Sequence, residues 1–184
     1  MTTDIGYLRL MSVAQLELPF GVRVLANIMV GSNQATSALG KSSPLRTLED
    51  GIRFHQVRAR AKALIIGGNT YRNEHYQKSP LPIFVASTSL APIQSEKLTI
   101  APVSPKELIS LAQESVGFPV LIEGGVNFLY SLIKEKAIDA LLITHTPNSG
   151  DGDFWNDESL KSNYKLFSHE KISESIFEIW IPKP

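Results

Sequence analysis

The sequence lacks several features that would each place it in a different class of protein. None of its 184 residues is cysteine, which excludes disulfide bonds, thiolate metal sites and cysteine nucleophiles. Its four histidines show no metal-ligand spacing, so we expect no metal site. Eighteen basic and eighteen acidic residues cancel. This balance disfavours nucleic acid or a membrane as a partner and favours a small-molecule substrate.

Long apolar runs are also missing. No stretch reaches the roughly 18 apolar residues that a membrane helix needs. The amino-terminal segment is interrupted by Asp4, Arg9 and Glu17 and lacks the pattern of a signal peptide. We therefore expect a cytoplasmic protein. The length and the apolar fraction of 43% predict that residues 1–184 form a single domain with a buried core.

Short apolar runs alternate with helical patterns along the chain. We expect strands at residues 22–30, 63–66, 83–86, 97–100, 120–122, 140–144 and 176–181. Helices are expected after the N-caps Thr47 and Ser104 and over residues 126–136. This alternation predicts an α/β fold with a mostly parallel central sheet, helices on both faces and an antiparallel C-terminal strand. Residues 31–46 and 147–163 are expected to be polar loops, and Trp155 in the second is interpreted as part of a lid or a subunit contact.

Two of the expected strand-to-helix turns are rich in glycine. They are Gly67-Gly68-Asn69-Thr70 and Glu123-Gly124-Gly125-Val126. Glycine lets a backbone approach a phosphate closely, and the following helix offers free N–H groups to it. Both turns should lie beyond the carboxyl ends of parallel strands, where ligands of open α/β sheets bind. Either turn alone is equally consistent with a purely geometric role. Together they favour a nucleotide ligand.

Four segments of the sequence resemble those of a known family. The segments VLANIMV, FHQVRARAKALIIGGNTYRNEHY, PIFVASTSL and VLIEGGVNFLYSLIKEKAIDALLIT match, in order and spacing, the reductase domain of the bifunctional deaminase–reductases of riboflavin biosynthesis. These pyrimidine reductases belong to the dihydrofolate-reductase-like superfamily. The match covers residues 22–146. It implies a dihydrofolate-reductase-like three-layer α/β/α fold, a homodimer, and NADPH as hydride donor. The residue after Ser87 is Thr88 where the family usually has a basic residue, which keeps NADH open.

The resemblance also implies which residues bind each ligand. Carried over by position, the cofactor would contact Gly67, Gly68, Thr70, Ser87, Glu123, Gly124, Gly125 and Val126. The substrate would contact Asn27, Ser32, Asn33, Lys41, Ser42 and Glu74, with Lys41 and Ser42 holding a substrate phosphate. The family's Asp-Gly after the first strand is Asn33-Gln34 here.

No catalytic group is fixed by the resemblance, and two carboxylates are candidates. Asp50 lies four residues before Phe54, where a dihydrofolate reductase keeps its pterin-binding acid, but it is also an ordinary first-turn helix acid. Glu123 could contact a ligand or only accept hydrogen bonds from neighbouring N–H groups. A third feature, the basic residues Arg53, Arg58, Arg60 and Lys62, predicts a solvated helix face, with phosphate binding as the alternative.

Three functions remain open from the sequence. The first is an NADPH-dependent reductase of a ribosylaminopyrimidine phosphate, which converts a ribosylamino group into a ribitylamino group. The second is a reductase of a pterin or folate-like substrate. The third is a nucleotide-binding protein without catalytic activity. Likeness at the level of the fold cannot separate them.

Overall fold

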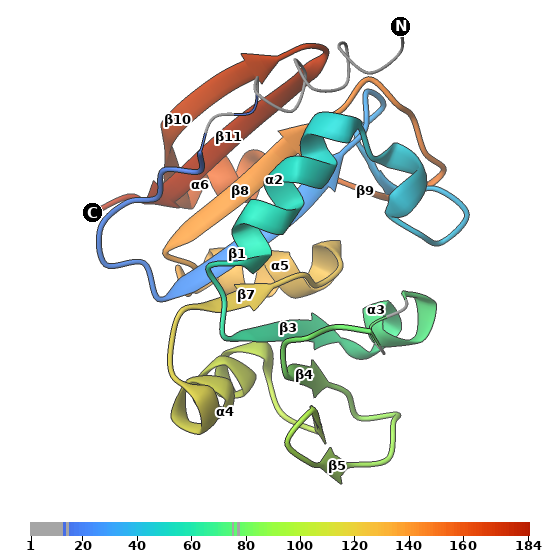
Figure 1. The fold of residues 1–184 in the computed structure, drawn as a ribbon, viewed down its shortest axis with the longest axis vertical. Coiled ribbons are helices and arrows are strands. Elements are labelled where there is room, and N and C mark those ends of the chain that lie inside the picture. Colours follow the sequence, from blue (N-terminus) through green and yellow to red (C-terminus); the bar gives the residue numbers. More distant parts are fainter. Residues whose placement is uncertain (1–12, 14, 75, 77) are drawn as a thin grey trace, which may run out of the picture.

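The computed structural model describes residues 13, 15–74, 76 and 78–184 (Figure 1). In chain order the strands are β1 (Val24–Val30), β2 (Ala35–Ser37), β3 (Ala63–Gly67), β4 (Ile83–Ala86), β5 (Ile93–Gln94), β6 (Leu98–Ala101), β7 (Val120–Ile122), β8 (Ala140–His145), β9 (Gly152–Phe154), β10 (Tyr164–Ile172) and β11 (Ser175–Pro182). The helices are the short 3-10 helix η1 (Ser43–Leu45), α2 (Leu48–Arg58), α3 (Gly68–Asn73), α4 (Pro105–Val116), α5 (Val126–Lys134) and α6 (Glu158–Asn163).

Nine of the described strands form one sheet in the order β10-β11-β8-β1-β7-β3-β4-β6-β5. The central strands β8, β1, β7, β3, β4 and β6 pair in parallel. The edges are antiparallel: β11 pairs with β8 and with β10 at one side, and β5 pairs with β6 at the other. The predicted mostly parallel sheet is confirmed. At the C-terminal end the structure has two antiparallel strands where the sequence predicted one.

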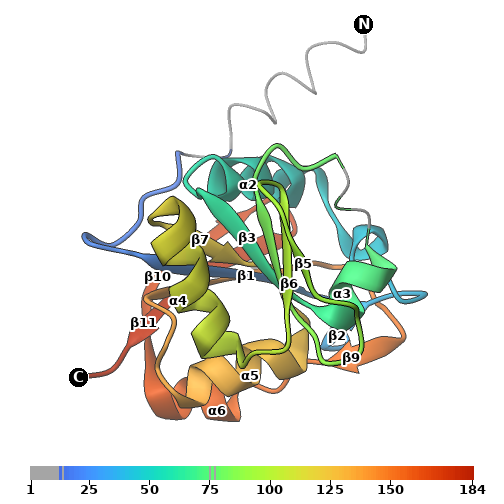
Figure 2. The same ribbon diagram turned by 90° about the horizontal axis from the view of Figure 1, so that it is seen from below.

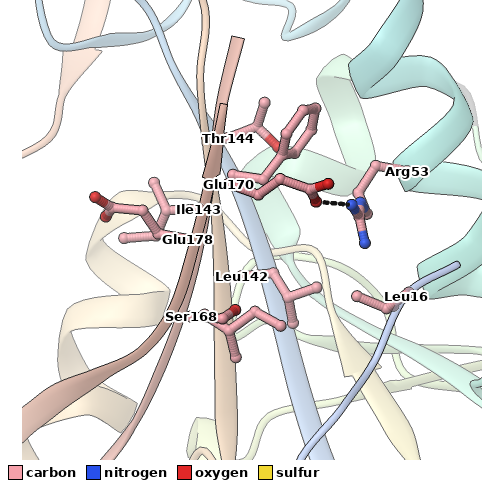
Figure 3. A pocket seen from close by; sticks show the side chains of 10 residues that line it. Leu16, Arg53, Leu142, Ile143, Thr144, Ser168, Glu170 and Glu178 are labelled. Atoms are coloured by element: carbon pink, nitrogen blue, oxygen red, sulfur yellow. Dashed lines mark hydrogen bonds and ion pairs between the residues drawn. The ribbon is translucent and has the colours of Figure 1, made fainter. Parts of the chain in front are cut away.

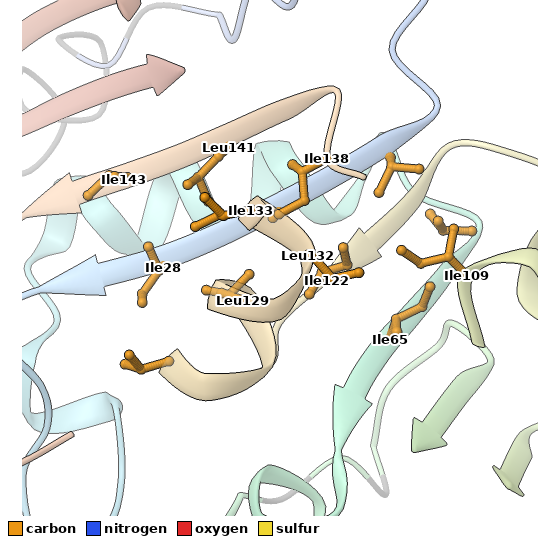
Figure 4. Packing of buried hydrophobic residues seen from close by; sticks show 14 of the residues in the cluster. Ile28, Ile65, Ile109, Ile122, Leu129, Leu132, Ile133, Ile138, Leu141 and Ile143 are labelled. Atoms are coloured by element: carbon orange, nitrogen blue, oxygen red, sulfur yellow. The ribbon is translucent and has the colours of Figure 1, made fainter. Parts of the chain in front are cut away.

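Helices cover both faces of the sheet, as predicted. Alternate residues of β1 point to opposite faces, so Ala26 and Ile28 pack with α4 and α5, whereas Leu25 packs with α2. Figure 2 shows α4, α5 and α6 on one side of the sheet and α2 on the other. In Figure 4, Leu129 and Leu132 of α5 lie among the side chains of the strands. Each such fully buried side chain contributes about 1.5–3 kcal/mol.

The helix caps read from the sequence are present. The Thr47 side chain accepts a hydrogen bond from the Asp50 N–H at the start of α2. Ser104 and Glu107 form a complete capping box at the start of α4. These caps satisfy backbone donors that have no partner within the helix. The Thr47 cap fixes where α2 begins, and α2 places Asp50 beside the sheet.

Several elements were not predicted. The sequence pattern does not reveal β10, because it is an edge strand whose outward residues are polar, including Lys165 and Lys171, and such residues obscure a strand pattern. The predicted loop 147–163 contains β9 and α6, and β9 pairs with β2 from the other predicted loop. The interpretation of Trp155 as a lid or subunit contact is wrong, because this side chain is buried and stacks on Tyr130 with ring centroids 5.2 Å apart.

Candidate active-site cleft

One large cleft opens at the carboxyl ends of the central parallel strands. Its volume is about 810 Å³, within the range of small-molecule and cofactor sites. Residues that follow β3, β4 and β7 form one end of it, and α2 with the β2–β9 pair forms the other. Every residue that the family resemblance assigns to the cofactor lines this cleft: Gly67, Gly68, Thr70, Ser87, Glu123, Gly124, Gly125 and Val126.

Three glycines in the two turns have different neighbours. A Cβ atom on Gly68 would lie 2.7 Å from the Ser87 hydroxyl, and one on Gly124 would lie 2.8 Å from the Phe128 ring. These two glycines are therefore required by the protein's own packing. A Cβ atom on Gly125 would meet only the Thr70 hydroxyl, at 3.6 Å. The surface in front of Gly125 is open to the cleft.

Gly125 is also the N-cap residue of α5 and supplies no side-chain hydrogen bond to the first turn of the helix. The first N–H groups of α5 therefore lack a side-chain cap. Such N–H groups, together with the helix dipole, favour an anion such as a pyrophosphate. Two observations therefore show that this turn fits a dinucleotide. The approach to Gly125 is open, and the N-terminus of α5 has no side-chain cap.

Asp50 lies in the first turn of α2 and lines the opposite end of the cleft. Its side chain is only 4% exposed and accepts a hydrogen bond from Arg46 Nε at 3.3 Å. Burial raises the pKa of Asp50 above its usual value, against hydrogen bonding from Thr144 of β8 and the positive charge of Arg46. A buried carboxyl group with a raised pKa in a cleft can hold or transfer a proton.

Glu123, the second candidate, is already engaged by the protein. Arg58 of α2 binds it with two hydrogen bonds, Nε to Oε1 at 2.7 Å and Nη2 to Oε2 at 2.6 Å. Burial acts to lower the pKa of Arg58, but the hydrogen bonds and charge of Glu123 outweigh it and raise that pKa. The Tyr76 hydroxyl donates to Glu123 Oε2 at 3.3 Å, and burial holds the pKa of Tyr76 well above its usual value. Glu123 thus fixes Arg58 at the cleft wall.

The predicted solvated face of α2 is wrong for two of its arginines. Arg58 lines the cleft, as described above. Arg53 is buried and donates from Nη2 to Glu170 of β10 at 2.8 Å (Figure 3). Arg53 and Glu170 border a second cavity of about 30 Å³. That volume suits a single water molecule rather than a substrate.

The predicted substrate residues divide into two groups. Asn27, Ser42 and Glu74 line the cleft. The backbone N–H and the hydroxyl of Ser42 both donate to Glu74 Oε1 at 2.8 Å, which ties the loop after β2 to the end of α3. These two bonds hold Ser42 at the cleft wall.

Ser32, Asn33 and Lys41 do not line the cleft. The Ser32 hydroxyl donates to the Asn148 carbonyl at 3.4 Å. The Asn33 side chain donates to the Gly150 carbonyl at 2.8 Å and accepts from the Gly150 N–H at 3.2 Å. These contacts join the two loops, and Lys41 is exposed beside them. Their assignment to the substrate stays a prediction.

The sequence did not assign Arg46, Phe54, Arg72 or Tyr76 to the cleft, and it indicated Arg58 only through the alternative of phosphate binding. The guanidinium groups of Arg46 and Arg58 lie over the ring of Phe54, with Cζ 4.4 Å and 4.2 Å from the ring centroid. Phe54 and Arg58 are four residues apart on α2, a spacing that places them on one helix face. Tyr76 and Arg72 carry no comparable signal because their position depends on α3 and the segment after it. Among the described residues, no cluster of three or more His, Asp or Glu could hold a metal ion.

The mixed, mostly parallel sheet with antiparallel C-terminal strands matches the dihydrofolate-reductase-like α/β fold. Within this class the chain belongs to the RibD C-terminal domain family, which matches residues 31–177. This is a family of NAD(P)H-dependent reductases. The recognised family and the predicted fold class are therefore confirmed.

Solved structures agree on the fold. Dihydrofolate reductase from Enterococcus faecalis, complexed with NADP(H) and RAB-propyl, is 18% identical with a TM-score of 0.68, covering 88% of this chain and 97% of that one. A protein from Shewanella sp. PV-4 described as a riboflavin biosynthesis protein is 18% identical, with a TM-score of 0.65 and coverages of 88% and 99%. A pyrimidine reductase-like protein from Corynebacterium diphtheriae is 17% identical, with a TM-score of 0.70 and coverages of 96% and 99%. No curated protein sequence matches this chain.

None of the described helices is long and apolar enough to cross a membrane.

Proposed function

We propose that this chain is an NADPH-dependent reductase whose substrate is a ribosylaminopyrimidine phosphate of the riboflavin-pathway type. The observation that carries the proposal is that one cleft contains both the glycine turns suited to a dinucleotide and a buried acid, Asp50, with a raised pKa. Membership of the RibD C-terminal domain family supports it. The homodimer implied by the same family stays a prediction, which light scattering would check.

A hydride transfer asks little of the protein's side chains. The bound cofactor supplies the hydride, and the protein must hold the acceptor carbon against it while excluding water. At the cofactor end, the N–H groups at the start of α5 would bind the pyrophosphate in front of Gly125. At the other end, Asp50 would hydrogen-bond to the heterocycle and provide the proton that accompanies the hydride.

The substrate phosphate would bind near the two guanidinium groups of this end. Arg58 and Arg46 both line the cleft within a turn or two of Asp50. The Nη1 group of Arg58 takes no part in its two hydrogen bonds to Glu123. Guanidinium groups recognise phosphate with paired, charge-assisted hydrogen bonds. This placement supports a phosphorylated substrate through the arginines rather than through Lys41.

A second candidate is a reductase of a pterin or folate-like heterocycle. Asp50 favours it, because a buried carboxylate at this position of α2, four residues before Phe54, resembles the pterin-binding acid of dihydrofolate reductases. A ring with adjacent N–H donors would pair with its two oxygens. This candidate shares the cofactor end of the cleft and differs only in what Asp50 contacts.

One turnover screen separates these functions. The purified chain would be mixed with NADPH or NADH and either the ribosylaminopyrimidine phosphate or dihydrofolate, and loss of the reduced-nicotinamide absorbance followed. We expect consumption with the pyrimidine. Consumption with dihydrofolate alone would establish the second candidate instead. If neither substrate is reduced, but each cofactor raises the melting temperature, the chain is a nucleotide-binding protein. No turnover and no thermal shift would contradict the reductase proposal.

A further inference from the structure

Thr144 of β8 connects the buried Asp50 to the small second cavity of the structure. Its hydroxyl donates a hydrogen bond to the Asp50 carboxyl group, and the residue also lines the cavity of about 30 Å³. Thr144 is buried and does not line the cleft, whereas Asp50 does. Asp50 therefore faces the cleft directly and faces the cavity through Thr144.

A row of paired residues leads from Thr144 to the surface. Thr144 of β8 pairs with Phe177 of β11, which pairs with Glu170 of β10. Side chains of directly paired residues point to the same face of a sheet. Figure 3 shows Thr144 and Glu170 on the side of Arg53, which comes from α2. The Glu170 side chain is 42% exposed, so one end of the row reaches solvent while the other contacts Asp50.

The cavity has room for a group that joins the two ends of this row. Two strand spacings, about 10 Å in total, separate the backbone of Thr144 from that of Glu170. Both residues nevertheless line the same cavity of about 30 Å³. A water molecule needs a cavity of roughly 10–15 Å³ or more and two to four polar partners. The volume and the lining therefore suit one water that bridges Thr144 and Glu170.

Arg53 supplies a third polar partner for such a water. Its side chain is 8% exposed and donates from Nη2 to Glu170 at 2.8 Å, while its Cζ lies 5.1 Å from the centroid of the Phe177 ring. The Nε group is buried and has no hydrogen-bond partner within the described part of the chain. Arg53 lines the cavity, and buried donors that no protein group reaches are normally satisfied by ordered water. The Nε group thus points independently to a water at this position.

We propose that a water molecule in this cavity forms, with Glu170 and Thr144, a proton relay that returns a proton to Asp50 from the surface behind the cleft. The inference rests on the proposed function, in which Asp50 gives up one proton in each turnover. A cleft filled by cofactor and substrate excludes water, so the proton needs a route that avoids the cleft.

Each step of the relay moves one proton between oxygen atoms. Glu170 takes a proton from solvent and passes it to the water. The water passes a proton to the Thr144 oxygen, and the Thr144 hydroxyl passes its own proton to the Asp50 carboxylate. Only O–H bonds break and form, and the net result is one proton moved from solvent to Asp50. Arg53 is a positioning residue that orients the water.

A high-resolution crystal structure of the parent chain tests the water site without turnover. We expect one ordered water within hydrogen-bond distance of Arg53 Nε, the Thr144 hydroxyl and the Glu170 carboxylate. A cavity that holds no ordered water would overturn the relay and leave the reductase proposal intact.

Rapid-mixing kinetics tests the relay by comparing the first turnover with those that follow. Thr144→Val would be compared with the control Thr146→Val, which removes a hydroxyl that is also buried but lines neither the cleft nor the cavity. The reaction would use NADPH and the substrate that the parent reduces, at mildly acidic pH, where Asp50 already holds a proton. We expect Thr144→Val to retain the rate of the first turnover within about threefold and to slow later turnovers by about tenfold or more. Thr146→Val should change either rate by less than about twofold.

A rescue experiment tests the surface end of the relay. Glu170→Gln removes the exposed proton carrier and should slow later turnovers by about threefold to tenfold. Imidazole in solution should restore the rate of Glu170→Gln but not that of Thr144→Val, because a solute can replace a surface group but not a buried hydroxyl. Circular dichroism would verify that all three variants stay folded.

Four results would contradict the relay. Equal slowing of first and later turnovers in Thr144→Val would overturn it, because Thr144 would then act only on Asp50 directly. Unchanged later turnovers in Thr144→Val would overturn it because Asp50 would then regain its proton through the cleft. A Glu170→Gln variant that imidazole does not restore would overturn the role of Glu170 as proton carrier. If the parent reduces no substrate, the reductase proposal is overturned and the relay with it.

Discussion

The two ends of the cleft are built in different ways. The cofactor end consists mainly of backbone: short turns directly after β3 and β7, with Gly125 open to the cleft. The substrate end consists of side chains held by partners far away in the sequence, such as Arg58 with Glu123 and Ser42 with Glu74. Backbone N–H groups are present whatever the side chain, so only added atoms can damage the first end. The second end is damaged when a partner is removed.

This difference predicts how each end responds to substitution. Variants at the substrate end should change chemistry or stability through lost charges and hydrogen bonds. At the cofactor end, a variant at the open position Gly125 should act by obstruction and spare the rest of the molecule. Substitutions at each end of the cleft test this difference.

Asp50→Asn should have the largest effect. If the buried carboxyl group transfers a proton, kcat should fall by about a hundredfold to ten-thousandfold, as for other general acids. Steady-state kinetics with NADPH would measure it. The same variant should be at least as stable as the parent at neutral pH, because it removes a buried negative charge. A variant that keeps full kcat would show that Asp50 is only a first-turn helix acid.

The pH dependence of stability provides a control for the pKa of Asp50. Burial raises this pKa in the folded state, so between the unfolded value of about 3.9 and the folded value the native protein binds more protons. The contribution of the protonated Asp50 carboxyl group to stability is therefore lost as pH rises from the unfolded to the folded pKa. Asp50→Asn should abolish this loss of stability. Glu107 has the opposite sign: hydrogen bonds from Ser104 lower its pKa, so its contribution is lost as pH falls. Urea unfolding at several pH values would separate the two.

Arg58→Ala should have the next largest effect, on stability. The Glu123 side chain is 7% exposed, and removing its guanidinium partner leaves an unpaired, largely buried charge. We expect the free energy of unfolding to fall by about 3 kcal/mol. This is the lower limit of the usual loss when a buried ion pair is broken, and it applies because the Arg58 side chain is 26% exposed. Arg60→Ala is the matched control, since Arg60 donates to the Leu16 carbonyl and forms no ion pair within the described part of the chain. Equal destabilisation by both variants would remove the special role of the Arg58–Glu123 pair.

At the cofactor end, two glycines form a matched pair. Gly125→Val adds atoms in front of α5, where a Cβ meets nothing closer than 3.6 Å, so the protein should fold normally and bind the dinucleotide about tenfold or more weakly. Gly124→Val should instead destabilise the protein by about 1–3 kcal/mol, because its Cβ would lie 2.8 Å from the Phe128 ring. Thermal melting with and without cofactor measures both. A stable Gly125→Val that binds like the parent would place the pyrophosphate elsewhere.

The same contrast explains what could be predicted from the sequence. The central strands and the turns after β3 and β7 follow from local patterns of apolar residues and glycine, so Gly67, Gly125 and their neighbours were placed correctly at the cleft. The substrate end depends on contacts between distant segments. The pairing of β2 with β9 and the ion pair of Arg58 with Glu123 leave no local signal. A helix crowded with arginine predicted a solvated face because a counter-charge 65 residues away is not visible in the sequence.

Lys41 and Arg46 provide the smallest and most discriminating test of the substrate end. The family resemblance assigns Lys41 to a substrate phosphate, but this residue is exposed and does not line the cleft, whereas Arg46 lines it beside Asp50. Lys41→Ala should therefore change kcat/KM by less than about twofold, as expected for a solvated side chain. Arg46→Ala should lower kcat/KM for the phosphorylated pyrimidine by about tenfold and much less for its dephosphorylated analogue, because the lost hydrogen bonds are charge-assisted. If Lys41→Ala instead loses tenfold only with the phosphorylated substrate, the loop after β2 must close over the cleft when substrate binds. The substrate end would then be completed by backbone movement, and its contrast with the preformed cofactor end would be larger than the structure already suggests.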